Sequence, residues 1–139
     1  MTDIFTKEKR SWNMSRIKGK DTKPEIILRS LLHRSGLRFR LHEKKLPGRP
    51  DIVLPRYKTV IFVNGCFWHH HENCKYAYMP KTRALFWKEK FERTVQRDLE
   101  KNSALSAEGW HVITVWECEL KKSSCKVVEW ILKFLWELE

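Results

Sequence analysis

The sequence lacks any long uninterrupted apolar segment. Its first residues, MTDIFTKEKRSWNMSRIKGKDTKPE, are polar and charged, so we expect no secretory signal. The most apolar stretch, VVEWILKFLWELE, is too short and too often interrupted by charge to span a bilayer. We therefore expect a cytoplasmic protein with no membrane-spanning part, in a compartment where thiols stay reduced.

Acidic residues are few relative to basic ones. Lys and Arg number 28 against 17 Asp and Glu, which gives a net charge of +11. Such an excess disfavours self-association and favours polyanionic partners. We expect a monomer that binds nucleic acid. An anionic membrane surface fits less well, because the chain has no long basic amphipathic helix to spare from the core. A basic domain that is merely soluble is the remaining alternative.

The chain has only four cysteines, Cys66, Cys74, Cys118 and Cys125. In a reducing compartment, cysteines are metal ligands or free thiols before they are disulfides. Cys125 falls in the last predicted helix, away from the other three, and we expect it to be a thiol of the core.

The segment NGCFWHHHENC (64–74) concentrates metal-binding residues. Cys66, His71 and Cys74 lie in one loop that can wrap around an ion, and Cys118 follows a strand that can end beside that loop. Zinc prefers four tetrahedral thiolate and imidazole ligands. We expect these residues to form a closed, structural zinc site. A set of unrelated buried cysteines is the alternative.

The pattern of apolar residues predicts an α/β fold in a single domain over residues 21–139, preceded by a flexible basic arm over residues 1–20. Thr22 and Glu25 have the spacing of a capping box, and Gly36 suits a helix end. The predicted elements are a helix over 22–35, strands over 37–41, 51–54 and 60–63, a helix over 81–105, a strand over 110–116 and a helix from about Ser124. This α-β-β-β-α-β-α order predicts a mixed sheet flanked by helices, with strands 51–54 and 60–63 as a hairpin and strand 60–63 at the centre.

Each predicted helix has an apolar face that we expect to pack inward. The residues concerned are Ile27, Leu28, Leu31 and Leu32 in the first helix, Trp87, Phe91, Val95 and Leu99 in the second, and Val127, Val128, Ile131, Leu135 and Leu138 in the last.

Two acidic residues stand where a nuclease would hold a cation. Asp51 begins a strand directly after PGRP, and Glu25 lies in the first turn of the first helix. A carboxylate at a strand end, opposite a second carboxylate, is how hydrolytic nucleases hold Mg²⁺. The alternatives are that Asp51 is a turn residue and that Glu25 only caps its helix.

The zinc prediction leaves His69 without a role. Its ordinary pKa near neutrality suits a general base that activates water, although a structural histidine is the alternative. Asp98, in the long helix, could orient that histidine or form a surface salt bridge. Phe67 and Trp68 are hard to explain as core residues of a polar loop, whereas Trp87 also fits the apolar face of its helix.

Several segments together resemble the very-short-patch-repair (Vsr) DNA mismatch endonucleases. They are MSRIKGKDTKPE, LPGRPDIVLP, VIFVNGCFWHHH, CKYAYMPKTR, FWKEKFERTVQRD and GWHVITVWECEL, and they extend from about Arg10 to Leu120. The resemblance implies a restriction-endonuclease-like fold and a Mg²⁺-dependent nick 5′ to the thymine of a T:G mismatch, which arises when 5-methylcytosine deaminates. It also implies a functional link to a DNA cytosine-5 methyltransferase and an enzyme associated with the nucleoid through its DNA.

The resemblance assigns roles to the candidate residues. Asp51 would bind Mg²⁺ with the backbone carbonyl of Val63, His69 would be the general base, and Glu25 and Asp98 would support them. Cys66, His71, Cys74 and Cys118 would hold structural zinc. Phe67, Trp68 and Trp87 would form an aromatic wedge that enters the base stack, and the arm, with Arg16, Lys18 and Lys20, would contact the DNA backbone.

Asn64 departs from the family pattern. The best-known members carry a Thr-His pair where this chain has Val63 and Asn64, and an amide cannot act as the acid that a histidine can be. Three alternatives to a mismatch endonuclease stay open. Asn64 most favours a zinc-stabilised DNA-binding module without catalysis. The others are a related Mg²⁺ nicking or restriction-like nuclease with another specificity and, as a weaker alternative, a ββα-metal nuclease in which the run of histidines holds the catalytic metal.

Overall fold

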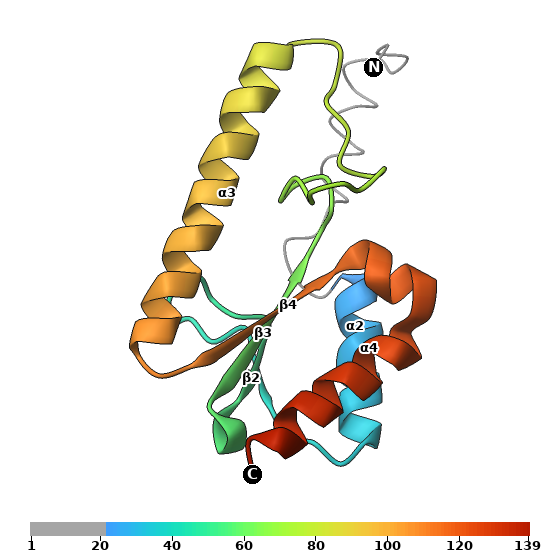
Figure 1. Cartoon of the computed structure of the whole chain (residues 1–139), viewed down its shortest axis with the longest axis vertical. Helices are drawn as coiled ribbons and strands as arrows, with labels where there is room; N and C mark the ends of the chain where they lie inside the picture. Colours follow the sequence, from blue (N-terminus) through green and yellow to red (C-terminus); the bar gives the residue numbers. More distant parts are fainter. Residues whose placement is uncertain (1–21) are drawn as a thin grey trace.

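The computed structural model describes residues 22–139 (Figure 1). The basic arm predicted over residues 1–20, with Arg16, Lys18 and Lys20, lies outside the described residues.

The described chain is a mixed α/β structure, as predicted. Its elements are α2 (Lys23–Arg34), β1 (Arg40–Leu41), β2 (Ile52–Leu54), the 3-10 helix η1 (Pro55–Tyr57), β3 (Thr59–Asn64), α3 (Ala84–Ala107), β4 (His111–Trp116) and α4 (Glu117–Glu137). None of the helices between residues 22 and 139 is long and apolar enough to cross a membrane.

Four strands form one sheet in the order β1-β2-β3-β4. The predicted hairpin is confirmed, because β2 pairs antiparallel with β3, and the 3-10 helix between them was not predicted. The central position of β3 is confirmed as well, since β4 pairs with its other side in parallel register, with Val63 opposite Val115. The α3 crossover between two parallel strands places the ends of β3 and β4 at the same edge of the sheet, and the candidate site lies there.

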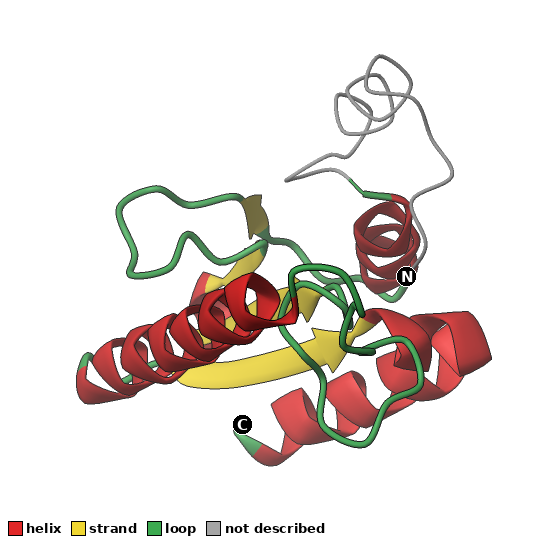
Figure 2. Cartoon of the chain, turned by 90° about the horizontal axis from the view of Figure 1, so that it is seen from above, coloured by secondary structure: helices red, strands yellow, loops and turns green. Residues whose placement is uncertain are grey.

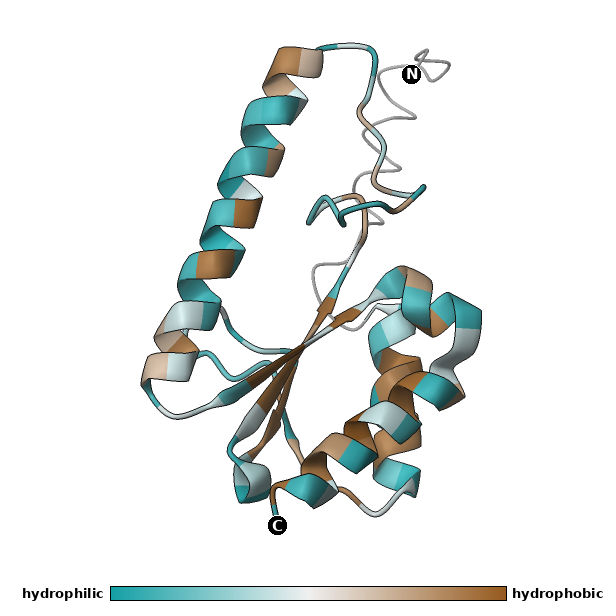
Figure 3. Ribbon diagram, viewed as in Figure 1, coloured by the Kyte–Doolittle hydropathy of each residue, from teal (hydrophilic) through white to brown (hydrophobic). Residues whose placement is uncertain are grey.

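Helices cover both faces of this sheet (Figures 1 and 2). On one face, α2 and α4 pack together over a core that includes Leu28, Ile61 and Ile131. On the other face, α3 contributes Leu105 to a smaller cluster with Val60 and Phe62. Figure 3 shows the same division, with apolar colour on the strands and on the inner sides of α2 and α4.

The apolar face predicted for α3 is only partly buried, which corrects the sequence prediction. Phe91 is buried, but Val95 and Leu99 are exposed. The reason is the spacing. A step of four residues turns about 400° in an α-helix, so residues four apart drift around the helix by about 40° per step. Phe91 and Leu105 lie on the covered side, whereas Val95 and Leu99 have turned away from it. The helix of 24 residues is about 36 Å long and the six residues of β3 or β4 extend about 20 Å, so its N-terminal half extends past the sheet and runs beside the loop that follows β3 (Figure 1).

Other boundaries also differ from the predictions. The strand expected over 37–41 is reduced to Arg40–Leu41, and the last helix begins at Glu117 instead of about Ser124. Ser123 has an extended backbone that interrupts α4, so the predicted start marks its second helical segment. Glu119 accepts a hydrogen bond from the backbone N–H of Trp116 (2.9 Å) and thereby caps the first segment.

Three side chains expected inside lie at the surface. Cys125 is exposed on α4, so it is not a thiol of the core. Leu138 lies beyond the last turn of α4 and is exposed, and Ile27 on α2 is exposed as well. Leu28, Leu32, Val128, Ile131 and Leu135 are buried as predicted.

Candidate functional site

The end of β3 and the start of α4 bring four metal-binding side chains together. One ligand atom from each of Cys66, His71, Cys74 and Cys118 lies within 4.8 Å of the others. Cys66 follows β3, and Cys118 lies in the first turn of α4, directly after β4. Because β3 and β4 are parallel neighbours, both thiols reach the same edge, as the sequence predicted.

The donors of this cluster suit zinc. The Nδ1 of His71 is 3.5 Å from the Sγ of Cys118, and a tetrahedral zinc site holds its ligand atoms roughly 3.3–3.8 Å apart. The ring of His71 stacks on Trp116 with a centroid distance of 4.0 Å, which fixes its orientation. Among residues 22–139, the thiols of Cys66, Cys74 and Cys118 are free of disulfides.

Protonation of these thiols opposes metal binding. Burial raises the pKa of Cys66 to about 12, and it also raises the pKa of Cys118. Burial acts in the same direction on Cys74, but hydrogen bonds from the Tyr76 backbone and the Cys66 thiol outweigh it and lower that pKa. A metal ion that binds here must therefore displace protons, so its affinity falls at low pH.

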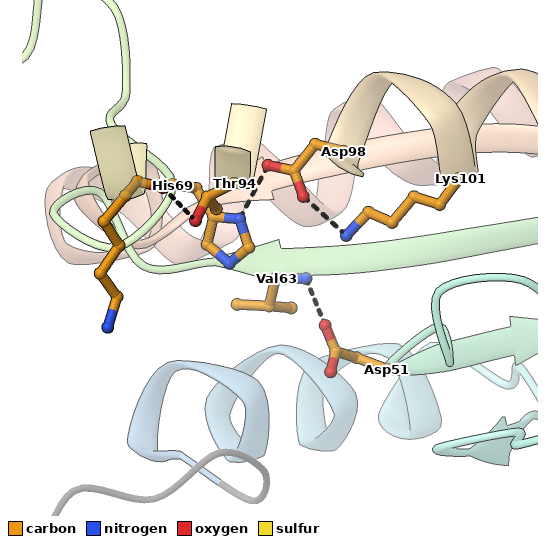
Figure 4. A network of polar contacts seen from close by, with 7 residues as sticks. Asp51, Val63, His69, Thr94, Asp98 and Lys101 are labelled. Atoms are coloured by element: carbon orange, nitrogen blue, oxygen red, sulfur yellow. Dashed lines mark hydrogen bonds and ion pairs between the residues drawn. The ribbon is translucent and has the colours of Figure 1, made fainter. Parts of the chain in front are cut away.

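Beside this cluster, the sheet edge opens into a cleft of about 530 Å³ lined by Glu25, Asp51, Val63, Asn64 and His69, among others. Asp51 accepts a hydrogen bond of 2.7 Å from the backbone N–H of Val63, which fixes its carboxylate at the end of β3 (Figure 4). Burial raises the pKa of Asp51, and this hydrogen bond and the neighbouring cations oppose that rise only in part. A cation bound in the cleft would offset the cost of burying this charge.

His69 lies on the opposite side of the cleft from α2. Its Nδ1 is 2.8 Å from the Oδ2 of Asp98, and the other oxygen of Asp98 is 3.1 Å from the Nζ of Lys101 (Figure 4). Burial acts to raise the pKa of Asp98, but the hydrogen bond and charge of His69, together with Lys101, outweigh it and lower that pKa. The charged carboxylate holds the imidazole in one orientation, with Nε2 as the nitrogen that can accept a proton.

Glu25 faces the cleft instead of capping its helix. The Thr22 side chain makes no capping hydrogen bond, so the predicted capping box is wrong. The carboxylate of Glu25 is buried, and its Oε2 is 3.7 Å from the Nε2 of His42. Glu25 and Asp51 thus lie on two sides of one histidine, and together with His42 they form a second group that could hold a metal ion.

His42 and Lys101 are cleft residues that sequence reasoning missed. His42 directly follows β1, and its position opposite Asp51 depends on the strand register. Lys101 could have been found, because it is three residues after Asp98 on the same helix. His70, the histidine next to His69, stacks on Phe91 at a centroid distance of 4.6 Å. Asn64 is buried at the end of β3.

The aromatic residues predicted as a wedge form a cluster. The ring of Phe67 lies 5.1 Å from that of Trp68, 5.4 Å from Trp87 and 5.2 Å from the buried Phe91. Phe67 therefore packs the loop against α3 and does not project freely. Exposed apolar residues nearby include Tyr78, whose ring lies 5.1 Å from that of Phe67, and Leu85 at the start of α3, which is 70% exposed.

Gly48 passes closely over Lys101 and has a φ of +75°. A Cβ atom there would lie 2.5 Å from the Cδ of Lys101, too close for any real contact. We expect Gly48→Ala to destabilise the fold by about 2–4 kcal/mol, the sum of left-handed backbone strain and overpacking. Chemical denaturation measures this change.

Gly36→Ala is the matched control for that substitution. Gly36 has a φ of +92°, but a Cβ there would meet nothing within 4 Å. It should cost only about 1 kcal/mol, from backbone strain alone. Equal losses for the two variants would show that Lys101 is not packed under Gly48.

The chain is similar to known DNA endonucleases. A family model described as DNA mismatch endonuclease Vsr matches residues 2–75. The type II nicking enzyme V.XorIIP of Xanthomonas oryzae pv. oryzae is 51% identical over 120 residues, which cover 86% of this chain and 88% of that protein. The type II nicking enzyme V.NmeAIP of Neisseria meningitidis is 47% identical over 127 residues, which cover 91% of this chain and 90% of that protein. The DNA mismatch endonuclease Vsr of Escherichia coli is 48% identical over 121 residues, which cover 87% of this chain and 77% of that protein.

Proposed function

Because the chain belongs to the DNA mismatch endonuclease Vsr family and is a DNA endonuclease, we propose that it nicks one strand of a duplex 5′ to the thymine of a T:G mismatch, by Mg²⁺-dependent hydrolysis. The observation that carries the proposal is the cleft at the end of β3. It combines a buried carboxylate, Asp51, with an oriented imidazole, His69.

The residues of the cleft fit a hard divalent cation. Asp51 and the backbone carbonyl of Val63 would hold Mg²⁺, and the carboxylate of Glu25 lies in the same cleft to support it. When bound, Mg²⁺ supplies stabilisation of the charge that develops on the phosphate and makes a water molecule more acidic. The hydrogen bond from the Val63 N–H keeps Asp51 oriented toward the strand end.

His69 would act as the general base. Its Nδ1 faces Asp98, so Nε2 would accept the proton of the attacking water. Asp98 would stabilise the imidazolium that results, and Lys101 would hold Asp98 in place. Asn64 can give or accept a hydrogen bond at the strand end but cannot protonate the leaving oxygen.

The Cys66, His71, Cys74 and Cys118 cluster would hold Zn²⁺ with a structural role. It would anchor the loop that carries His69 and so set the position of the general base without taking part in the chemistry. A set of four protein ligands leaves no open coordination position for substrate.

The aromatic cluster would recognise the mismatch by unstacking it. A mispaired step costs less to unstack than a paired one, and apolar side chains inserted between base steps kink the duplex. Phe67, Trp68 and Trp87 lie together beside the cleft, with exposed apolar residues at the start of α3. This arrangement supports a wedge of several rings in which Phe67 is the anchored member.

The remaining expectations belong to the same proposal. The enzyme would be a cytoplasmic monomer with a restriction-endonuclease-like domain over residues 21–139, associated with the nucleoid through DNA and linked in function to a DNA cytosine-5 methyltransferase. Residues 1–20, with Arg16, Lys18 and Lys20, would contact the DNA backbone, in keeping with the net charge of +11.

A nicking assay on strand-labelled duplexes tests the proposed function. With zinc-loaded protein and Mg²⁺, we expect the thymine strand of a T:G duplex to be cut roughly 10–100-fold or more faster than that of a T:A duplex. The reason is that replacing a recognised base pair, here T:G by T:A, costs about 1–3 kcal/mol of recognition. The product should end directly 5′ to the mismatched thymine. Omission of Mg²⁺ should stop the reaction while DNA binding persists.

Two other outcomes separate the competing functions. Equal cutting of matched and mismatched duplexes would favour a nicking enzyme of another specificity. This is the main competing function, because V.XorIIP and V.NmeAIP are both named type II nicking enzymes. Tight binding with no cut in Mg²⁺ or Mn²⁺ would contradict the catalytic proposal altogether.

A further inference from the structure

His42 lies in the catalytic cleft, but the mechanism above gives it no role. Its backbone N–H donates a 3.2 Å hydrogen bond to the carbonyl of Asp51, which extends the pairing of β1 with β2 by one residue. His42 and Asp51 are therefore cross-strand partners. The position of the imidazole thus follows from the sheet register and does not depend on a free loop.

The ring of His42 stands between two carboxylates. Its Nε2 is 3.7 Å from the Oε2 of Glu25, and its Nδ1 is 3.8 Å from the Oδ1 of Asp51. The side chains of Glu25 and Asp51 are 4% and 16% exposed, so both charges are largely removed from water. Burying two carboxylates beside one imidazole costs free energy unless a positive charge compensates them, so the site favours a bound cation.

These separations suit a shared metal ion better than direct hydrogen bonds. A hydrogen bond to nitrogen rarely exceeds about 3.2 Å. Atoms that share an octahedral ion at about 2.1 Å lie roughly 3.0–4.2 Å apart. One ligand atom from each of Glu25, His42 and Asp51 lies within 4.8 Å of the others, so small movements bring all three into the coordination range.

We propose that His42 is a direct ligand of the catalytic cation, together with Glu25 and Asp51, and that it widens the choice of metal from Mg²⁺ to transition-metal ions such as Co²⁺. The inference rests on the metal-dependent function proposed above. Mg²⁺ is served well by oxygen ligands alone, whereas an imidazole nitrogen adds affinity along the transition series. The enzyme should then bind Co²⁺ more tightly than Mg²⁺ in this cleft.

Two further features of the cleft agree with this role. His42 has a φ of +49°, in the left-handed region that costs a residue with a side chain about 1 kcal/mol, and such residues gather at functional sites. Lys101, the cation that also lines the cleft, forms its ion pair with Asp98, whose Oδ1 lies 3.1 Å from its Nζ, and it acts on Asp51 through charge alone and only partly offsets the burial of that carboxylate.

Metal titration of the zinc-loaded full chain tests the proposal without DNA. Calorimetry should show that His42→Gln weakens Co²⁺ binding about 10-fold or more but changes Mg²⁺ binding less than about 3-fold, because the glutamine oxygen can serve Mg²⁺. His33→Gln is the matched control, since His33 is exposed on α2 outside the cleft, and it should leave both affinities unchanged. The visible absorption spectrum locates the added ion. Weak Co²⁺ bands without thiolate charge-transfer bands would confirm that Co²⁺ is not bound in the cysteine cluster.

Three results would overturn the proposal. Unchanged Co²⁺ affinity in His42→Gln would exclude a ligand role. Equal losses for both metals would show that His42 only positions the carboxylates. If the variant does not fold, the unaltered protein decides, because Co²⁺ bound to His42 must shift the ring-proton NMR signals of that residue far outside the diamagnetic range, and the absence of such a shift is the third contradicting result. Failure of the proposed function has a different sign: the unaltered chain would neither bind Mg²⁺ nor nick DNA when Mg²⁺ is added.

Discussion

Asp51→Asn is expected to abolish nicking and, in the same protein, to raise the melting temperature. The loss of activity follows from removing a carboxylate that would hold Mg²⁺, which should cost several kcal/mol of transition-state stabilisation and so reduce the rate by roughly 10³-fold or more. The asparagine keeps an oxygen that can accept the hydrogen bond from the Val63 N–H, so the local geometry should persist.

The gain in stability follows from the pKa of Asp51. Burial raises this pKa in the folded chain, which means that the fold tolerates the charged form less well than the unfolded chain does. The stability that the protonated form provides is complete below the unfolded pKa and is lost as the pH rises through the folded pKa. Above its folded pKa, the charged Asp51 therefore destabilises the Mg²⁺-free protein, and a neutral asparagine removes that cost.

Two measurements on zinc-loaded, Mg²⁺-free protein check the expectation, namely thermal unfolding at neutral and at mildly acidic pH and single-turnover nicking after Mg²⁺ is added. The stabilisation should shrink toward acidic pH, where the native carboxyl is itself neutral. Glu129→Gln, at an exposed position on α4, is the control for loss of one negative charge and should change neither quantity. Retained nicking in Asp51→Asn would remove Asp51 from the catalytic scheme.

Local sequence patterns were sufficient to predict much of the fold. Alternating and continuous apolar runs located the strands, and the parallel pairing of β3 with β4 follows from the helix that joins them. The apolar face of α3 misled the prediction, because its period reports only that one face is apolar. Val95 and Leu99 are exposed because residues four apart drift around the helix, away from the side that buries Phe91 and Leu105. Which side of a helix becomes covered is a property of the assembled fold.

Some parts of the candidate site could also be predicted from the sequence, and others could not. The cluster of three cysteines and one histidine was predictable, because Cys66, His71 and Cys74 are close in sequence and Cys118 follows a strand end. The surroundings of Asp51 were not, because His42 reaches it only through the register of β1 with β2. Glu25 shows the limit of motif reasoning, since its spacing from Thr22 indicated a capping box, whereas its side chain is buried at the cleft.

Cys74→Ser is expected to remove zinc and to release the loop that carries His69. Four protein ligands bind structural zinc with an apparent binding free energy of about 10–16 kcal/mol in small domains, and removing one thiolate eliminates a large part of that binding free energy. The loop between β3 and α3 has no regular secondary structure between residues 65 and 83, so its order depends on this cluster and on the contacts of Phe67. We expect little bound zinc, a lower melting temperature and loss of nicking.

Cys125→Ser is the matched control, because Cys125 is an exposed thiol on α4 and lies outside the metal cluster. It should keep one equivalent of zinc and full activity. Zinc content by mass spectrometry, thermal unfolding and proteolysis between residues 65 and 83 report the three expected effects separately. If Cys74→Ser kept its zinc, or if Cys125→Ser lost it, the four-residue cluster would not be the zinc site. If Cys74→Ser lost zinc but nicked at the normal rate, the metal would not be what positions His69, and the contacts of Asp98 and Phe67 would be sufficient to hold the base in place.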